Sequence, residues 1–203
     1  MKENKYDDNI FFQKYSQMSR SQQGLAGAGE WETLRKLLPD FKDKRVLDLG
    51  CGYGWHCIYA MEHGASSVVG VDISHKMLEV AKEKTHFPQV EYKCCAIEDV
   101  EFPEESFDVI LSSLAFHYVA DYEILVKKIY RILKSGGKLV FTVEHPVFTA
   151  YGTQDWYYNE KGEILHFPVD NYYYEGKRTA VFLGEKVTKF HRTLTTYLNT
   201  LLS

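Results

Sequence analysis

The 203-residue sequence has no long apolar run, since no stretch approaches the roughly 20 residues that a membrane-spanning helix needs. Its amino end is polar and lacks the apolar segment of a secretory signal. It has four cysteines and no C-x-x-C pair, which argues against a disulfide framework or a zinc site. A net charge of -4 without a basic stripe disfavours nucleic acid as a partner. We therefore expect a cytoplasmic protein without a membrane contact, a metal or a nucleic-acid partner.

What the sequence does contain is an alternation of short apolar runs and amphipathic segments. After a helix expected over 29–38, the pattern predicts strands over 45–50, 66–71, 90–96, 107–113 and 138–144. Helices are predicted between them, over 53–63, over 75–86, and from 121 to the glycine pair at 136–137. Strands that alternate with helices imply right-handed crossovers, so we predict an α/β fold with a mainly parallel sheet.

The amino-acid composition changes after Pro146, where aromatic residues become frequent. Eleven of the 44 residues from 148 to 191 are aromatic, against 15% in the whole chain. Two β-hairpins are predicted here, over 157–167 and 179–190, followed by a helix over 191–202. Aromatic side chains suit a lid over a substrate pocket, and they equally suit a dimer interface. We favour the lid, and both roles are compatible.

The strongest motif is a glycine-rich loop between the first strand and the following helix. In Val46-Leu-Asp-Leu-Gly-Cys-Gly-Tyr-Gly54, three glycines at alternate positions let a ligand contact the bare backbone. Asp72 lies 20 residues beyond Gly52 at the end of the next strand, where its carboxylate can accept both hydroxyls of a ribose. The pattern predicts nucleoside binding; the alternative is a tight turn plus a surface aspartate.

A dinucleotide is a poorer match for this loop. The dinucleotide fingerprint has a third glycine where this sequence has Trp55, and the indole would crowd a pyrophosphate. An NAD-dependent oxidoreductase therefore remains only as an alternative function.

Four segments resemble successive motifs of the class I S-adenosylmethionine-dependent methyltransferases. They are 46–54, 69–74, 98–113 and 133–139, within a similarity that runs from about residue 40 to 146. The resemblance implies a Rossmann-like three-layer sandwich, with the predicted hairpins inserted after the fifth strand. It implies S-adenosyl-L-methionine as methyl donor and S-adenosyl-L-homocysteine as product, with in-line methyl transfer. A small molecule is favoured as the acceptor, because the sequence has no basic surface and no added nucleic-acid module. A non-catalytic scaffold that retains the cofactor fold is the other alternative.

The resemblance also assigns the cofactor site. The residues that match are Tyr15, Asp48, Gly50, Cys51, Gly52, Asp72, Ile73, Met77, Ile97, Glu98, Leu114 and His117. Ala96 stands where the family usually has an acid, so Glu98 is expected to replace it or to be an ordinary loop residue. His117 lies near the cofactor or only caps a helix. The segment from Phe11 to Tyr15, with Arg20, resembles the cap that folds over the cofactor, or it packs only on the sheet.

Two histidines are candidate general bases, because imidazole titrates near neutrality. His145 ends the fifth strand on the ligand-binding edge of such a sheet, and His191 ends the aromatic segment. For each, a structural hydrogen bond is an equally good interpretation.

The predicted organisation has four parts: a helical cap over 1–40, the cofactor-binding core over 41–146, the aromatic β insertion over 147–190 and a final helix over 191–203. The antiparallel strand pair that usually completes the family's sheet has no counterpart before Ser203. The fifth strand is then expected to form a sheet edge, covered by the insertion or by a second chain in a homodimer.

Overall fold

The computed structural model describes residues 3–151 and 154–203 and centres on a parallel five-stranded sheet. The sheet order is β3-β2-β1-β4-β5. Its strands are β1 (Arg45–Leu49), β2 (Ser67–Asp72), β3 (Val90–Cys94), β4 (Phe107–Ser113) and β5 (Leu133–Thr142). The predicted Rossmann-like α/β fold is confirmed. The strand order reverses between β1 and β4, and ligands bind to sheets of this type in the crevice at that point.

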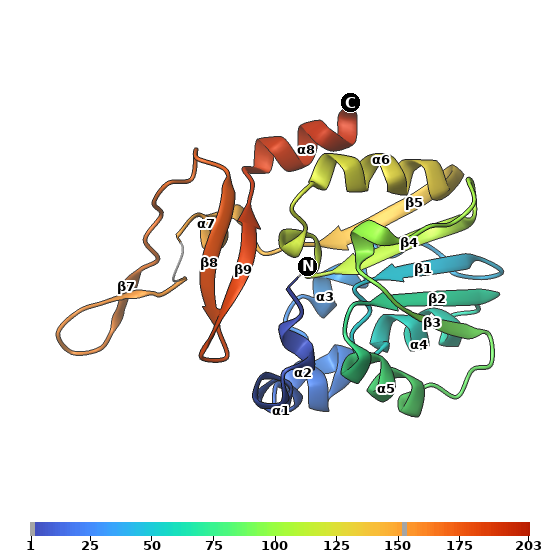
Figure 1. The fold of residues 1–203 in the computed structure, drawn as a ribbon, viewed down its shortest axis with the longest axis horizontal. Coiled ribbons are helices and arrows are strands. Elements are labelled where there is room, and N and C mark those ends of the chain that lie inside the picture. Colours follow the sequence, from blue (N-terminus) through green and yellow to red (C-terminus); the bar gives the residue numbers. More distant parts are fainter. Residues whose placement is uncertain (1–2, 152–153) are drawn as a thin grey trace.

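Helices cover both faces of the sheet, which makes three layers (Figure 1). On one face, α4 (Trp55–Glu62) and α5 (His75–Lys84) pack on side chains such as Val46 and Val68. On the other face, α6 (Tyr122–Ile132) and α8 (Leu194–Leu202) pack on Leu47 and Val69. Successive side chains of a strand point to opposite faces of the sheet, so neighbouring apolar residues pack into two separate hydrophobic cores, one on each face. No helix in the described part of the chain is long and apolar enough to cross a membrane.

Two predicted helix boundaries were wrong. The helix expected over 29–38 is the short α3 (Trp31–Leu34). The helix expected to run to the glycine pair ends at Ile132, and Leu133 already pairs with Phe107 in β5. The register shifts before Val109 pairs with Lys138, and Gly136, at a φ of 75°, lies in that irregularity. The glycines therefore serve a bulge in a strand and not a helix end.

The amino-terminal segment lies along the carboxyl edge of the sheet. It comprises η1 (Lys5–Asp7), α1 (Asn9–Ser16), α2 (Ser19–Gln22) and η2 (Gly24–Gly27). The carboxylate of Asp7 accepts hydrogen bonds from Ser74 Oγ at 2.6 Å and from the Lys76 amide at 3.1 Å, at the start of α5. This contact fixes the segment to the end of β2.

We expect the substitution Asp7→Ala to lower the free energy of unfolding by about 1 kcal/mol, the usual cost of losing an N-terminal helix cap. Urea unfolding of both proteins measures the difference. Asp170→Ala is the matched control, because Asp170 is exposed in a loop and we expect no change there. Equal stability of the Asp7 variant and the wild type would contradict a capping role.

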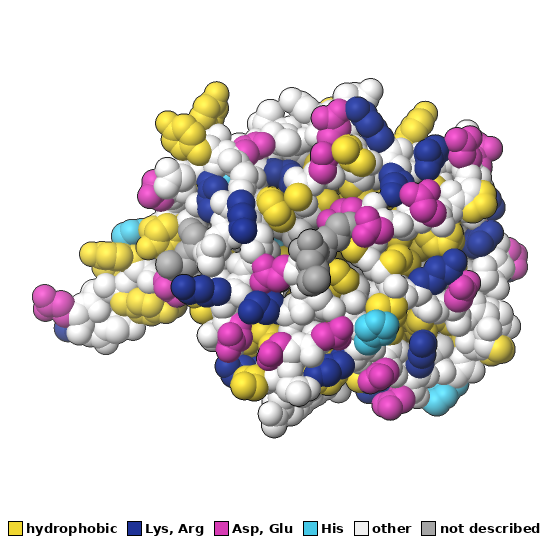
Figure 2. All heavy atoms as spheres, in the orientation of Figure 1, with side chains coloured by type: hydrophobic (Ala, Val, Ile, Leu, Met, Phe, Trp, Pro, Cys, Tyr) yellow, Lys and Arg dark blue, Asp and Glu magenta, His cyan; other side chains and the backbone are white. Residues whose placement is uncertain are grey.

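The segment after β5 folds into α7 (Pro146–Ala150) and two hairpins. The strands are β6 (Tyr157–Tyr158) with β7 (Ile164–His166), and β8 (Gly176–Phe182) with β9 (Glu185–His191). Both predicted hairpins are present. The first stands away from the body of the molecule (Figures 1 and 2). The second stands beyond the carboxyl ends of the sheet strands, and neither hairpin extends the five-stranded sheet.

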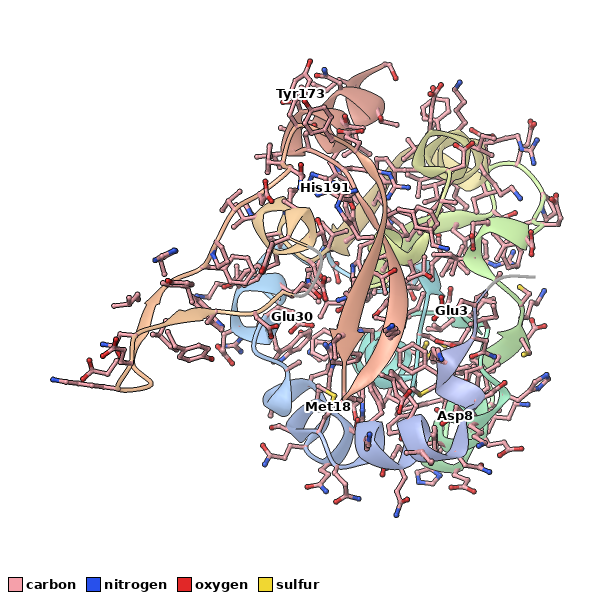
Figure 3. The ribbon with its side chains drawn as sticks, turned by 60° about the vertical axis from the view of Figure 1, so that its left-hand side comes forward. Glu3, Asp8, Met18, Glu30, Tyr173 and His191 are labelled. Atoms are coloured by element: carbon pink, nitrogen blue, oxygen red, sulfur yellow. The ribbon has the colours of Figure 1, made fainter. Side chains whose placement is uncertain are left out.

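The tip of the β8–β9 hairpin reaches the amino-terminal segment (Figure 3). Phe11 of α1 is fully buried and packs with Ala180 and Val187 of the hairpin. Lys14 Nζ donates to the Leu183 carbonyl at 3.0 Å. The first and last parts of the chain thus meet over the edge where ligands of such folds bind. Two 3-10 turns complete this edge, η3 (Ile97–Asp99) after β3 and η4 (Phe116–Tyr118) after β4.

Candidate functional site

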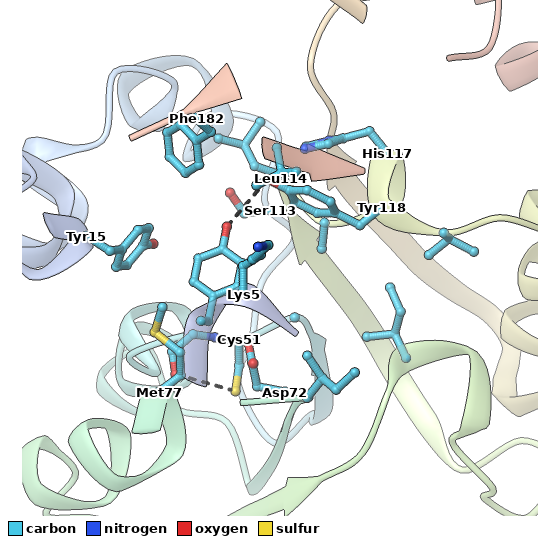
Figure 4. Close-up of a pocket in the computed structure, with 18 of the residues that line it drawn as sticks. Lys5, Tyr15, Cys51, Asp72, Met77, Ser113, Leu114, His117, Tyr118 and Phe182 are labelled. Carbon is cyan, nitrogen blue, oxygen red and sulfur yellow. Dashed lines mark hydrogen bonds between the residues drawn. The ribbon is translucent and has the colours of Figure 1, made fainter. Parts of the chain in front are cut away.

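A cavity of about 710 Å³ opens at the carboxyl ends of the strands, where the strand order reverses. This volume lies within the roughly 300–1,000 Å³ typical of small-molecule sites. Cys51, Asp72 and Met77 form one side, and Leu114, His117 and Phe182 form the opposite side (Figure 4). The cavity therefore lies between the core sheet and the β8–β9 hairpin.

The glycine loop exposes its backbone to this cavity. Gly50 and Gly52 have φ values of 79° and 52°, in the left-handed region that favours glycine. A Cβ on Gly52 would meet nothing within 4 Å, whereas a Cβ on Gly50 would lie 2.6 Å from Ala115 Cβ. Gly50 is thus required by packing, and Gly52 leaves open space where a ligand can approach the chain closely.

Asp72 lies at the end of β2 and links the loop to the next turn. Its carboxylate accepts the amide hydrogens of Gly52 and Ser74, each at 2.9 Å. The side chain lines the cavity, and burial raises the pKa of this carboxyl despite both hydrogen bonds. A carboxylate held in this way presents its remaining lone pairs to the cavity, where hydroxyl groups of a ligand can donate to it.

The structure brings the predicted cofactor residues together, with one exception. The lining includes Tyr15, Gly50, Cys51, Gly52, Asp72, Ile73, Met77, Ile97, Glu98, Leu114 and His117. Asp48 lies behind the loop instead, buried in β1, and does not belong to the lining found in residues 3–151 and 154–203.

Asp48 has an unusual environment. Its Oδ2 accepts from Cys57 Sγ at 3.5 Å, while Oδ1 has no hydrogen-bond partner in the described ranges. Burial raises the pKa of Asp48 to about 7. The carboxyl of Asp48 is therefore tied to α4 through Cys57, and its burial favours the protonated form.

Neither His145 nor His191 belongs to the cavity lining in the described residues. His145 is exposed and caps α7, where its Nδ1 accepts from the Val147 amide at 3.2 Å. His191 is fully buried, with its Nδ1 2.8 Å from Thr149 Oγ1 and its Nε2 2.7 Å from the Tyr172 carbonyl. Both rings make structural hydrogen bonds, and the prediction of a catalytic role receives no geometric support.

A polar cluster that the sequence analysis missed occupies the hairpin end of the cavity. Glu144, one residue before His145, lines the cavity together with His117. Lys189 of β9, with 2% of its surface exposed, donates to Glu144 Oε1 at 2.5 Å and to Gln154 Oε1 at 2.8 Å. The Gln154 amide donates to the other Glu144 oxygen at 2.9 Å. A polar residue at the end of β5 was predicted to reach the site, but it is Glu144 and not His145 that lines the cavity.

The titration behaviour of this cluster follows from its burial and charges. Burial lowers the pKa of His117 to about 4, so its imidazole is neutral near pH 7. The Glu144 amide donates to His117 Nδ1 at 3.4 Å, which leaves the ring proton on Nε2. Burial opposes ionisation of Glu144, but the ammonium of Lys189 and the hydrogen bonds from Lys189 and Gln154 hold the pKa of this carboxyl below its usual value. The cluster therefore contains an ionised carboxylate paired with a buried ammonium.

Aromatic and hairpin side chains close the remaining wall. Tyr6 of η1 and Tyr118 of η4 meet through their hydroxyl oxygens at 3.5 Å. Burial raises the pKa of both phenols, so they are neutral hydrogen-bonding groups. The insertion adds Lys177, Phe182, Val187, Thr188 and Phe190. The amide of Thr188 donates to Glu3 Oε2 at 3.2 Å, which joins β9 to the amino-terminal segment.

Comparisons with known proteins agree with this geometry. Residues 47–141 match the methyltransferase domain family. A structure from Listeria monocytogenes, provisionally assigned as an S-adenosylmethionine dependent methyltransferase, is 58% identical with a TM-score of 0.82. The match covers 86% of this chain and 82% of that one.

Two further relatives match along most of the chain. A Mesorhizobium loti S-adenosylmethionine dependent methyltransferase is 41% identical with a TM-score of 0.82, covering 88% of this chain and 81% of that one. A Haemophilus influenzae protein without an assigned activity is 36% identical over 97% of this chain and 80% of its own length.

Proposed function

Because the chain belongs to the class I S-adenosylmethionine-dependent methyltransferases, we propose that it methylates a small molecule held at the hairpin end of its cavity. The observation that carries this proposal is the continuity of the cavity. One space is lined by the glycine loop and Asp72 at one end and by Glu144 and Phe182 at the other. A donor and an acceptor can therefore occupy it together.

We assign the glycine-loop end to the donor. Asp72 accepts hydrogen bonds from the ribose hydroxyls, and the open backbone at Gly52 lies along the ligand. Ile73, Met77 and Ile97 supply apolar contacts to the adenine, and Glu98 is the acid beside it. Leu114 and His117 lie toward the methionine end, and Tyr15 covers the site from α1. The open backbone at Gly52, the carboxylate of Asp72 and the volume of the cavity all fit S-adenosylmethionine.

We propose the insertion over 147–190 as the lid on the acceptor, next to the core over 41–146 that binds the donor. Phe182 and Phe190 offer apolar contact area to a small ligand, and the tyrosine hydroxyls and Glu144 offer polar contacts. The visible surface intersperses acidic and basic side chains over the whole face (Figure 2). That distribution suits a ligand recognised inside a cavity better than a polyanion lying on the outside.

The reaction that we propose is an in-line displacement, in which the acceptor–carbon bond forms as the sulfur–carbon bond breaks. S-adenosylmethionine supplies the electrophilic methyl group on its sulfonium. The chain aligns the acceptor and excludes water. The titratable groups described at the hairpin end have pKa values far from neutrality, which is unfavourable for general-base catalysis. The acceptor is therefore expected to present an unprotonated nucleophile or to lose its proton to water.

A labelling experiment tests the acceptor class. The protein is incubated with methyl-tritiated S-adenosylmethionine and a cell extract that is then divided into a small-molecule filtrate and retained macromolecules. We expect the label in the filtrate, because the acceptor end is an enclosed cavity. Label only in the retained protein or nucleic acid would refute the small-molecule proposal. Binding of S-adenosylmethionine without transfer of its methyl group would favour the scaffold alternative. If transfer occurs by in-line displacement, a chiral methyl group should arrive on the acceptor with inverted configuration.

A further inference from the structure

One ring nitrogen at the hairpin end of the cavity is left without a hydrogen bond. His117 of η4 lines the cavity, with 1% of its surface exposed. Its Nδ1 accepts from the Glu144 amide, so the proton of the neutral ring lies on Nε2. Within residues 3–151 and 154–203, Nε2 makes no hydrogen bond, and Glu144 Oε1 lies 3.9 Å from it. This N–H is therefore a donor without an acceptor.

A buried donor of this kind points to a ligand when it faces a cavity. Buried polar groups in native proteins are nearly always hydrogen-bonded, because leaving one unpaired costs free energy. The ring of His117 points toward Leu114 and Phe182 (Figure 4). Both of these residues also line the cavity. The donor is thus directed into the space that we assign to the acceptor.

The carboxylate of Glu144 complements this donor. Each of its oxygens accepts one hydrogen bond from the protein, Oε1 from Lys189 and Oε2 from Gln154. An ionised carboxylate has about four acceptor positions, so a lone pair remains on each oxygen. Because Glu144 also lines the cavity, an N–H donor and a carboxylate oxygen face the same space 3.9 Å apart.

This pair fits a group that both accepts and donates a hydrogen bond. A hydroxyl oxygen about 2.8 Å from each atom can accept from His117 Nε2 and donate its own hydrogen to Glu144 Oε1. An ether lacks the hydrogen that Glu144 requires, and an ammonium lacks the lone pair that His117 requires. A second carboxylate would be repelled by Glu144. A hydroxyl group is therefore the best match.

The surrounding wall suits an uncharged molecule. The buried ammonium of Lys189 balances the charge of Glu144. Glu3 and Lys177 also line the cavity, but both are exposed to solvent, where water screens their charges. The apolar side chains from the hairpin that line the cavity are Phe182, Val187 and Phe190. These contacts favour an apolar body that carries the hydroxyl.

We propose that His117 Nε2 and Glu144 Oε1 together bind a hydroxyl group of the methyl acceptor, which is an uncharged molecule with an apolar body. The inference rests on the proposed function and names the class of its substrate. Both residues are specificity-determining contacts. Lys189 and Gln154 hold the carboxylate and are positioning residues.

Three probes of similar shape test this site by ligand-observed NMR titration. Phenol donates and accepts, anisole only accepts, and toluene does neither. With S-adenosylhomocysteine bound, we expect the wild type to bind phenol at least about tenfold more tightly than anisole or toluene, the lower limit for a hydrogen bond to a charged group. Equal affinity for the three probes would overturn the proposal.

Substitutions at His117 assign the preference to this residue. His117→Phe removes the donor and should weaken phenol by about tenfold, while toluene changes by less than about threefold. His117→Gln retains an N–H donor at a similar reach and should keep part of the preference. His166→Phe is the matched control, because His166 is exposed on β7 outside the cavity lining, and it should change nothing. An unchanged preference in His117→Phe would overturn the proposal.

Two further measurements keep the result decisive. If His117→Phe does not fold, the ¹⁵N resonance of His117 Nε2 in the wild type is followed: phenol should shift it and toluene should not, and equal shifts would overturn the proposal. The probes are also titrated without the nucleoside. A wild type that does not bind S-adenosylhomocysteine would overturn the proposed function, whereas one that binds it without preferring phenol would overturn only the hydroxyl site.

Discussion

The substitution Asp72→Ala is expected to weaken binding of S-adenosylmethionine and S-adenosylhomocysteine by more than about 100-fold. In the proposed complex, two ribose hydroxyls donate to the Asp72 carboxylate, and each such bond to a charged group contributes about 1.5–3 kcal/mol. The variant also releases the Gly52 amide, which the carboxylate holds at 2.9 Å. Calorimetric titration with each nucleoside measures the loss.

A ligand change separates the ribose contact from the loop contact. S-adenosylhomocysteine without its 2'-hydroxyl should bind the wild type about tenfold more weakly or worse. The alanine variant should bind the two forms alike, because the hydroxyl has lost its partner. Asp170→Ala is the control, since Asp170 is exposed in a loop outside the cavity lining. If the alanine variant still discriminates against the deoxy ligand, Asp72 does not contact the ribose.

The substitution Asp48→Asn is expected to stabilise the protein relative to the wild type as pH rises. Burial raises the pKa of Asp48 from its ordinary 3.8 to about 7. A raised folded-state pKa contributes stability that is complete below 3.8 and is lost as pH rises to about 7, because the folded protein holds a proton that the unfolded chain has released. A pKa raised to about 7 corresponds to a loss of roughly 4 kcal/mol over this pH range.

Urea unfolding of the ligand-free protein between pH 5 and 8 measures this effect. The stability difference between the asparagine variant and the wild type should change by about 1.4 kcal/mol per pH unit below 7 and become constant above it. Asp108→Asn is the control with the opposite shift. Hydrogen bonds from Arg45 and Lys134 outweigh partial burial and lower the pKa of Asp108. Its contribution is therefore constant over this range. A flat difference for Asp48 as well would show that its carboxyl is ionised throughout.

The core fold was predictable because its signals are local. Short apolar runs marked β1 to β4, and the glycine loop with Asp72 marked the carboxyl ends of β1 and β2. The boundary between α6 and β5 was not predictable in this way. A glycine pair after an amphipathic segment is a typical helix end, and only the pairing of Leu133 with Phe107 across the sheet shows that the strand has already begun.

The two ends of the cavity also differ in whether local sequence signals reveal their residues. Most of the donor-end residues lie within a few positions of a strand end, so a motif can find them. The polar cluster at the other end joins Glu144, Gln154 and Lys189, which meet only when the insertion folds back on the core. A buried lysine gives no sequence signal, because an isolated lysine is read as a surface residue. Arg20 was noticed as part of a cap, but its contacts with Glu30 and Ser113 are tertiary.

The closure of the cavity by the two ends of the chain has a consequence for the order of folding. The five-stranded sheet is complete at Thr142. The contacts of Glu3 with Thr188 and of Lys14 with Leu183 can form only after the β8–β9 hairpin has folded. Contacts of such high sequence separation form late in folding. None of them involves a strand of the five-stranded sheet, so the amino-terminal segment and the β8–β9 hairpin can separate while the sheet stays intact. Amide hydrogens of η1, α1 and β9 should then exchange with solvent sooner than those of β1 and β4, and the same opening would let the proposed nucleoside product leave.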